Sequence, residues 1–175
     1  MTRLLVLRAA GVALSVGLLA GCGTSYSWRP GVPDAKRTVT VPTFANETDM
    51  IELGAVGARQ LLREIQREGT FRIAPEADAA LEVQGVVKKV SRGGVSYDRR
   101  TGMRYAGFTL KAEVEISVVD KARRAVIVDG KRYLASTPVT SSQDLMTYNR
   151  DASGRLMDDL ARQVVDDLLQ LKFTE

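Results

Sequence analysis

Residues 108–118 read FTLKAEVEISV, and this stretch decides the class of the fold. Apolar side chains occupy every second position from Phe108 to Val118, and polar or charged side chains occupy the positions between them. An alternation with a period of two is typical of a strand that buries one face and exposes the other. The sequence therefore predicts a β-sheet that is covered on one side only.

Neighbouring segments supply further strands of this sheet. Residues 81–90 alternate in the same way, and their apolar side is predicted to consist of Leu81, Val83 and Val87. Residues 125–136 follow as a less regular strand, and residues 71–73 form a short extended piece. The first strand is predicted over residues 38–44, TVTVPTF. Pro42 places this strand at a sheet edge or ends it there, because proline has no N–H to donate.

Two segments have the 3.6-residue periodicity of amphipathic helices. The first is predicted from about Met50 to Glu68, where Gly69 is a natural stop and residues 46–49 offer N-cap oxygens. The second follows the cap-like residues 141–144, and Gly154 is a place where its first half could bend. The predicted apolar stripe of the first helix is Ile51, Ala55, Ala58, Leu61, Leu62 and Ile65. That of the second helix is Leu156, Leu160, Val164, Leu168 and Leu171.

The order of these elements is β-α-β-β-β-α. Two amphipathic helices are enough to cover one face of a sheet of about four strands. A length of 175 residues suits one domain. The sequence therefore predicts an α+β fold, a two-layer sandwich in which both helices pack on one face of a mostly antiparallel sheet.

The first residues of the chain are typical of an export signal. Arg3 and Arg8 are followed by an apolar stretch that ends in Leu19-Ala20-Gly21-Cys22, the pattern of a bacterial lipobox. The apolar stretch is shorter than the ~20 residues that a membrane-spanning helix needs. Cys22 is the only cysteine, and it stands at the acceptor position for a diacylglyceryl group. An ordinary signal peptide with a chance cysteine is the alternative.

This pattern divides the chain into three parts. Residues 1–21 are predicted to be a lipoprotein signal peptide, residues 22–37 the lipidated N-terminus and a tether, and residues 38–175 a single periplasmic domain. Gly23 rather than an aspartate follows the cysteine, which resembles the default for passage to the outer membrane in bacteria with two membranes. We therefore expect an outer-membrane protein that its acyl chains, such as palmitate, anchor on the periplasmic side.

The composition excludes most classes of enzyme. The chain has no His and a single Cys, so it lacks the commonest general base, the commonest metal ligand and any internal disulfide. The carboxylate pairs Asp158-Asp159 and Asp166-Asp167 fall on the polar face of a helix and are better explained as solvated side chains. Gly93-Gly94 does not have the spacing of a phosphate-binding loop. We expect no catalytic residue, no metal ion and no cofactor.

Positive charge is concentrated in one segment. Residues 88–104 hold six basic residues and one acidic residue, whereas the predicted mature chain holds 23 basic and 21 acidic residues. As a hairpin tip, this segment suits phosphorylated or polyanionic partners, and its composition suits a merely solvated loop equally well. A smaller basic cluster, residues 121–124, is predicted at the opposite end of the sheet as a solvated turn. Nucleic acid is disfavoured as a partner, because the net charge falls short of a DNA-binding footprint.

The order of these features resembles a known family. A lipobox, a short aromatic tether, residues 41–48 (VPTFANET), an amphipathic helix, a β-meander and an acidic C-terminal helix are together similar to the LptE family of lipopolysaccharide-assembly lipoproteins. Residues 77–85 (ADAALEVQG), followed by a basic hairpin, add to this resemblance. The V-P-x-F-x-N-x-T pattern also occurs in other periplasmic lipoproteins, so the order of the elements is more specific than any single motif.

The resemblance implies a mechanism. LptE-type proteins plug an outer-membrane β-barrel of the LptD type, help it to fold, and contact lipopolysaccharide on its way to the outer leaflet. By position, this role implies lipid contacts for Arg92, Arg99, Arg100 and Arg104. It also implies an accessory protein rather than an enzyme. The alternative is a periplasmic lipoprotein of another envelope machine, either a curli-secretion-type pore subunit or an activator of peptidoglycan synthases. A pore subunit would need long spanning strands, for which this chain leaves little room.

Overall fold

The computed structural model describes residues 32–98, 104–140 and 145–171, and the side chains among them except those of 95–98, 104–106, 140 and 145–150. The helical elements are a short 3-10 turn, η1 (Asp34–Lys36), and the helices α2 (Leu53–Glu68) and α3 (Leu145–Gln170). The strands are β1 (Thr38–Thr40), β2 (Ala45–Asn46), β3 (Arg72–Ile73), β4 (Leu81–Asp98), β5 (Arg104–Asp120) and β6 (Ala125–Thr140).

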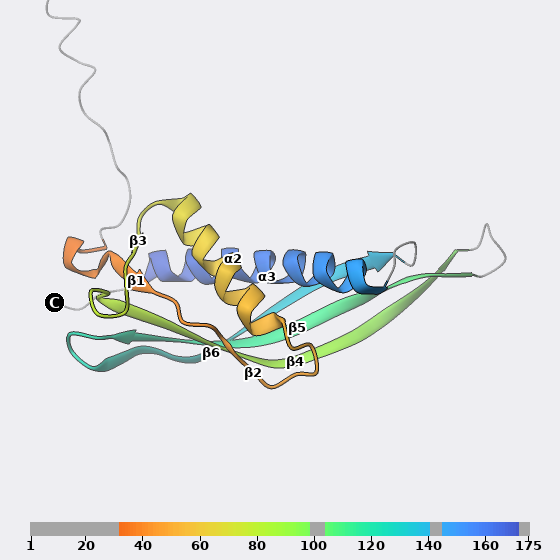
Figure 1. Ribbon diagram of the computed structural model, residues 1–175, viewed down its shortest axis with the longest axis horizontal. Coiled ribbons are helices and arrows are strands. Elements are labelled where there is room, and N and C mark those ends of the chain that lie inside the picture. The colour runs from red at the N-terminus through yellow and green to blue at the C-terminus, as the bar shows by residue number, and fades with distance from the viewer. Residues whose placement is uncertain (1–31, 99–103, 141–144, 172–175) are drawn as a thin grey trace, which may run out of the picture. The chain divides into compact units, whose positions relative to one another are not determined.

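The strands in the described part of the chain form one mixed sheet, in the order β3-β1-β4-β5-β6, with β2 pairing beside β4. β4, β5 and β6 make an antiparallel meander, as the sequence predicts. Both helices lie on the same side of this sheet (Figure 1). The α+β class is therefore confirmed, and the sheet has six strands rather than about four.

The parallel part of the sheet is the main departure from the predicted topology. β1 lies between β3 and β4 and runs parallel to both, so that Val39 pairs with Ile73 on one side and with Leu81 on the other. β2 also runs parallel to β4, pairing Ala45 with Val86. These strands are so short that an alternation of two cannot reveal their partner or direction. Pro42 falls in the gap between β1 and β2, where no ladder needs its missing N–H.

The core lies between the sheet and the two helices. Phe108 is partly buried against this core. Lys111, which points to the opposite face of β5, is exposed. The predicted inward set of β5 is buried, each side chain being at most 2% exposed: Leu110, Ala112, Val114, Ile116 and Val118. The alternation in residues 108–118 thus predicts the buried face of the sheet correctly.

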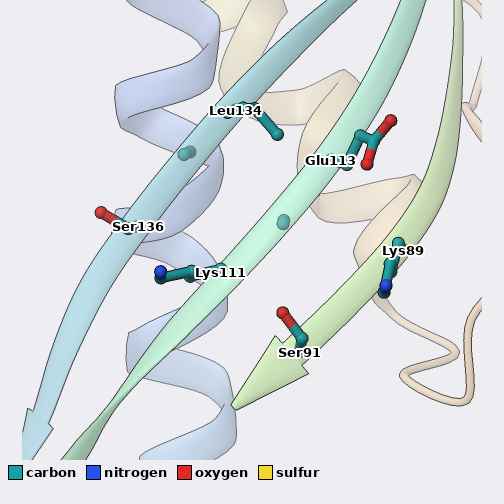
Figure 2. Close-up of a pocket in the computed structure, with 8 residues that line it drawn as sticks. Lys89, Ser91, Lys111, Glu113, Leu134 and Ser136 are labelled. Atoms are coloured by element: carbon teal, nitrogen blue, oxygen red, sulfur yellow. The ribbon is translucent and has the colours of Figure 1, made fainter. Parts of the chain in front are cut away.

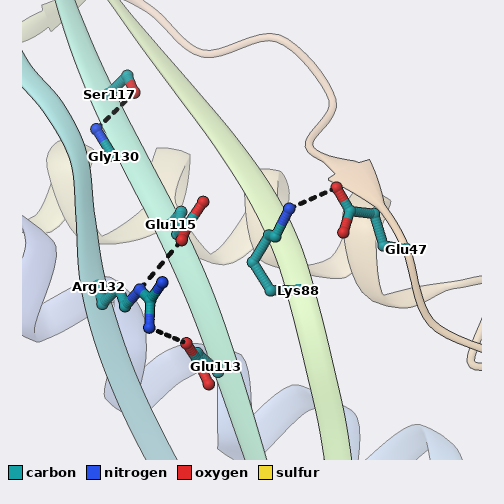
Figure 3. Close-up of polar contacts among 7 residues, drawn as sticks. All are labelled: Glu47, Lys88, Glu113, Glu115, Ser117, Gly130 and Arg132. Carbon is teal, nitrogen blue, oxygen red and sulfur yellow. Dashed lines mark hydrogen bonds and ion pairs between the residues drawn. The ribbon is translucent and has the colours of Figure 1, made fainter.

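A β-bulge in β4 interrupts the alternation that begins at Leu81. Val87 pairs with Val114, and the next pair joins Lys89 to Glu113, so Lys88 is an extra residue on this strand. Lys89 therefore shares the open face of the sheet with Glu113. The Lys88 side chain lies on that face as well (Figure 3). Two consecutive lysines on one face are a consequence of the bulge, since a regular strand would place them on opposite faces.

The same bulge decides the direction of Arg92. Arg92 pairs with Leu110, which is buried, so Arg92 lies on the helix side of the sheet rather than on the open side. The predicted hairpin tip over residues 88–104 is also shorter than expected, because β4 continues to Asp98 and β5 begins at Arg104. This hairpin reaches beyond the ends of both helices (Figure 1). Most of the basic segment is therefore strand rather than loop.

The start of α2 corrects two predictions. Ile51 precedes the helix and is 88% exposed, so it does not belong to the apolar stripe. No side chain of residues 46–49 caps the helix, because Glu52 is its N-cap residue and makes no side-chain cap hydrogen bond. Asn46 instead shapes the preceding turn. Its Nδ2 donates to the Met50 carbonyl at 2.8 Å, and its Oδ1 accepts from the Thr48 N–H at 3.1 Å.

Phe44 determines how closely α2 approaches the sheet. Its side chain is buried, 3% exposed, between α2 and β4. A Cβ atom on Gly85 would lie 2.5 Å from the ring, and one on Gly57 would lie 2.8 Å from it. Only residues without a side chain leave room for the ring at these two positions, so the two glycines are a requirement of the packing.

α3 is continuous through Gly154 and buries the predicted residues from Leu156 to Leu168 on its apolar side. It is attached to β6 through Asp167, which accepts a hydrogen bond from the Tyr133 hydroxyl at 2.6 Å and pairs with Lys131 at 2.6 Å. Burial alone would raise the pKa of Asp167, but these two bonds outweigh it and hold the pKa below its ordinary value. Burial, and then the contact with Asp167, raises the pKa of Tyr133.

The segment before β1 contacts the end of β5. Val32 is buried, and the Lys36 ammonium pairs with the Asp120 carboxylate at 2.5 Å. Asp120 also accepts from the backbone N–H groups of Ala122 and Arg123, at 3.1 and 3.2 Å. The bond from Lys36 lowers the pKa of Asp120. Val32 and Lys36, which lie inside the range 22–37 that the sequence assigns to a tether, therefore already contact the domain.

Candidate functional site

The structure describes part of the predicted lipid-binding site. Arg92 lies on β4, and Arg104 is the first residue of β5, where its backbone pairs with Asp98. Arg99, Arg100 and the lipidation site Cys22 lie outside the described residues. Because β4 and β5 are antiparallel, the segment that joins them is at the opposite end of β5 from the β5–β6 turn, as the sequence predicts for the two basic clusters.

Arg92 is held against the sheet by an aromatic ring. Its Cζ atom lies 5.2 Å from the centroid of the Phe108 ring. A cation over a ring face at an exposed position contributes about 0.5–1 kcal/mol. The N–H groups of a guanidinium lie in its own plane, so an arginine held in this way still presents donors to an anion.

The open face of the sheet is hollowed near the same end. A shallow depression of about 380 Å³ crosses the three strands of the meander (Figure 2). Leu134 stands in it as an exposed apolar side chain, 68% accessible to solvent. The side chains labelled in Figure 2 are Lys89 and Ser91 from β4, Lys111 and Glu113 from β5, and Leu134 and Ser136 from β6. The depression thus combines cations, hydroxyl groups and an apolar surface.

Carboxylates on this face are engaged by neighbouring cations. Arg132 on β6 bonds Glu115 through Nε at 3.1 Å and Glu113 through Nη1 at 3.4 Å (Figure 3). The Lys88 ammonium bonds Glu47, which follows β2, at 2.7 Å, and this bond raises the pKa of Lys88. These contacts are exposed, so solvent and salt screen them and they add little to the stability of the fold. Their main effect is to neutralise the middle of the open face.

Lys89 and Lys111, the two cations that line the depression, take no part in the ion pairs described above. Neither has a carboxylate within 4.0 Å among the described residues. They lie diagonally across adjacent strands, because Lys89 pairs with Glu113 and Lys111 is two residues before it. The Cα atoms of such neighbours are separated by roughly 7–8 Å. The two ammonium groups point apart in Figure 2, and both flexible side chains would have to turn toward a shared phosphate to contact it. With the Ser91 and Ser136 hydroxyls beside them, they form the best-supported anion-binding position on the described surface.

Neither lysine was predicted as a site residue. Lys111 is placed on the exposed face by the alternation of β5, so the sequence offered a signal for it. Lys89 owes its direction to the bulge at Lys88, which no alternation reveals. Arg92, the one predicted site residue whose side chain is described, belongs to the other side of the sheet at this end.

The remaining polar clusters have structural partners. Lys121, in the β5–β6 turn, bonds the Glu76 carbonyl and lies 4.0 Å from its carboxylate. Asp158 on α3 pairs with Arg162 one turn later. The part of the chain that the structure describes contains no group of three side chains suited to hold a metal ion.

Comparison with known protein families identifies the chain. The family model for LptE, described as lipopolysaccharide-assembly, matches residues 37–168, which is most of the sequence. The chain belongs to the LptE family. The matched range runs from the start of β1 almost to the end of α3, so the family is defined by the domain that carries the cationic surface. A search of the curated proteins gives no significant match.

Solved structures share the fold of this LptE-family protein at low identity. A protein from Caulobacter crescentus has a TM-score of 0.54 at 15% identity, covering 75% of this chain and 88% of that chain. A protein from Chlamydia trachomatis has a TM-score of 0.56 at 12% identity, covering 78% and 97%. One from Xanthomonas campestris has a TM-score of 0.57 at 11% identity, covering 81% and 89%. At such identities the likeness concerns the fold alone.

Neither helix in the described part of this LptE-family chain has an apolar stretch that is long enough to cross a membrane. α3 is the longer of the two, and its buried side is one stripe among acidic and basic residues. Both helices are therefore amphipathic elements that cover the sheet.

Proposed function

We propose that this protein is an outer-membrane lipoprotein, anchored through Cys22, that plugs an LptD-type β-barrel and helps it to assemble. In this role it contacts lipopolysaccharide during transport to the outer leaflet. Membership of the LptE family supports the proposal, since the family is one of lipopolysaccharide assembly. The protein acts as an accessory component rather than as an enzyme, as LptE-type proteins do.

The observation that carries the lipid contact is the cationic end of the open face. Lys89 and Lys111 are exposed there beside two serine hydroxyls and the exposed Leu134. A phosphorylated lipid has an anionic headgroup next to apolar chains, and this surface offers matching groups to each. Charge-assisted hydrogen bonds to phosphate are the stronger kind, at about 1.5–3 kcal/mol for each charged contact.

The predicted arginines add positive charge at the same end of β4, with Arg92 on the helix side of the sheet rather than on the open face. Arg92 lies at the same end of β4, and Arg99, Arg100 and Arg104 follow along the chain. We assign them the same ligand, a phosphorylated glycolipid, on the grounds of this position. The described ends of β4 and β5 project past the helices (Figure 1).

A lipopolysaccharide-binding titration tests the lipid contact. We expect the Arg99→Glu/Arg100→Glu double variant to bind at least about tenfold more weakly, since ~1.4 kcal/mol is a factor of ten and two charge-assisted contacts become repulsive. The Lys89→Glu/Lys111→Glu variant should lose a similar factor. Wild-type binding should also weaken with salt, because exposed charges are screened within ~10 Å at 0.1 M.

The Lys121→Glu/Arg124→Glu variant is the matched control, with the same change of charge at the opposite end of β5. It should retain wild-type affinity, and circular dichroism should show that all three variants are folded. If the control variant lost as much affinity for lipopolysaccharide, the change in net charge alone would explain the effect. Unchanged, salt-insensitive binding in the folded hairpin and open-face variants would contradict the proposed lipid contact.

Co-purification tests the barrel partnership separately. The protein should be extracted from detergent-solubilised outer membrane together with a β-barrel protein of the LptD type. Recovery with a secretion channel or with a peptidoglycan synthase would assign it to another envelope machine.

A further inference from the structure

The two outer edges of the meander differ in how well they are protected from pairing with another strand. On the β6 edge, Gln163 of α3 donates to the backbone carbonyl of Leu134 at 3.2 Å, and Pro138 has no N–H to offer. Lys131 of the same strand is engaged by Asp167 at 2.6 Å. These are devices that hinder another strand from pairing with an exposed edge.

Within the part of the chain that the structure describes, no such device covers the edge of β4 beyond its bulge. Its last backbone bond on the β2 side runs from the Glu47 N–H to the Val87 carbonyl, at 2.9 Å. From residue 88 to residue 98, β5 is the only neighbour of β4 within the described residues. The backbone groups that point away from β5 along this stretch are free to pair with an additional strand.

A groove of about 510 Å³ follows the first part of this free edge. Residues 47–50 form one wall and residues 88–92 form the other. Lys88 and Glu47, which both line this groove, neutralise each other at 2.7 Å (Figure 3). The remaining charges are Lys89 and Arg92 on the strand against Asp49 on the loop, so the strand wall is cationic.

The two cations point to opposite faces of the sheet. Lys89 is on the open face with Glu113, and Arg92 is on the helix side with Leu110. A strand added to this edge would also alternate its side chains between the two faces. Residues three apart on the added strand point to opposite faces, so the pattern Glu-x-x-Glu places one carboxylate beside Lys89 and the other beside Arg92.

We propose that the free edge of β4 from Lys89 to Arg92 accepts an extended, acidic segment of a partner protein as an added β-strand. Backbone hydrogen bonds supply the affinity in this mode of recognition, and side chains supply the specificity. A second copy of this chain is a poor occupant, because edge-to-edge pairing would bring Lys89 and Arg92 of the two copies together. The proposed lipid contact does not require this strand.

The test uses a defined probe, the labelled peptide acetyl-Thr-Glu-Val-Val-Glu-Thr-amide, whose glutamates meet both cations in either strand direction. Fluorescence anisotropy measures its binding to the full-length protein in detergent. Two further peptides carry N-methyl groups on alternate residues, one on the even-numbered and one on the odd-numbered amides. In strand addition, only the set that faces β4 can disrupt binding, so one methylated peptide should lose binding and the other should retain it.

Reversing the charges of Lys89 and Arg92 should reverse the preference of the protein between acidic and basic peptides. The Lys89→Glu/Arg92→Glu variant should bind the glutamate peptide at least about tenfold more weakly and should prefer the matching lysine peptide. Arg124→Glu is the matched control, because Arg124 is exposed in the turn between β5 and β6, far along β5 from the edge at residues 89–92. It should change peptide affinity by less than about twofold, since screening weakens charges at that distance.

Hydrogen–deuterium exchange locates the bound peptide. Residues 88–92 should gain protection, and the edge of β6 should not. Equal effects of the two methylated peptides, or protection of β6 instead of β4, would overturn the proposal. Protection of residues 88–92 by lipopolysaccharide but not by the peptide would also overturn it, and would assign the groove to the lipid.

Discussion

The packing around Phe44 depends on glycine, which has a hydrogen atom where alanine has a methyl group. Gly85→Ala would bring a Cβ atom within 2.5 Å of the ring, with the β4 backbone on one side and α2 on the other. Overpacking of this kind costs about 1–3 kcal/mol. We therefore expect a clearly lowered melting temperature in a thermal denaturation experiment.

Gly93→Ala is the matched control, since Gly93 is also on β4 but has no atom within 4 Å of an added Cβ. It should melt close to the wild type. If both variants melted at the same temperature, the close approach of Phe44 to β4 would be wrong.

Asp120 makes the stability of the domain dependent on pH. Its pKa is lowered by Lys36, so its contribution to the free energy of unfolding is complete above the ordinary aspartate pKa of ~3.9 and is lost as the pH falls through the lowered value. At pH 6 we expect Asp120→Asn to cost about 1–3 kcal/mol, because charged hydrogen bonds are removed. Urea unfolding at several pH values measures this cost. The difference between variant and wild type should shrink below about pH 4, and a difference that stays constant would exclude this role of the carboxylate.

At the scale of elements, β5 provides the sharpest contrast between two faces. Val114 is fully buried and Lys111 is exposed, because residues three positions apart on a strand point to opposite faces. Val114→Asp should be severely destabilising, because a buried unpaired carboxylate costs several kcal/mol out of a total of ~5–15 kcal/mol. Lys111→Asp should change the free energy of unfolding by no more than about 0.5 kcal/mol. Equal shifts in melting temperature would contradict the assignment of the faces.

The same element explains how far the fold was predictable. In β5 and α3 the buried positions repeat over many residues, and both the element and its inward face follow from the pattern. The bulge at Lys88 shifts the alternation by one residue. Each later side chain of β4, including Arg92, therefore points to the face opposite to the one that the unbroken pattern predicts. β1, β2 and β3 depend on long-range pairing that their few residues do not encode locally.

At the scale of the whole molecule, the proposed membrane attachment depends on one side chain, that of Cys22. Cys22→Ala should give an unprocessed precursor or a product that is released from the membrane, because the chain has no other cysteine to acylate. Intact-mass measurement of the wild-type membrane form should show a diacyl or triacyl addition at the mature N-terminus. An unmodified N-terminus at another residue would contradict the predicted lipoprotein.

The candidate site was predictable in charge but not in geometry. The excess of basic residues in 88–104 points to one end of the sheet, and β4 carries Lys88, Lys89 and Arg92 there. The sequence does not reveal that Arg132 neutralises Glu113 and Glu115, because these contacts join neighbouring strands. Which cations remain for a ligand is therefore a property of the assembled sheet.

The position of β1 between β3 and β4 constrains the order in which the chain can fold. Synthesis proceeds from the N-terminus, so Val39 and Phe44 are made before β4. That strand supplies Leu81, which pairs with Val39, and Gly85, which packs against Phe44. Until then, β1 can pair with no more than the short β3. The meander of β4, β5 and β6 is built from sequence neighbours, and such local topologies close quickly. We therefore expect β1 and Phe44 to dock only after β4 has been made, with their apolar side chains exposed to aggregation until then.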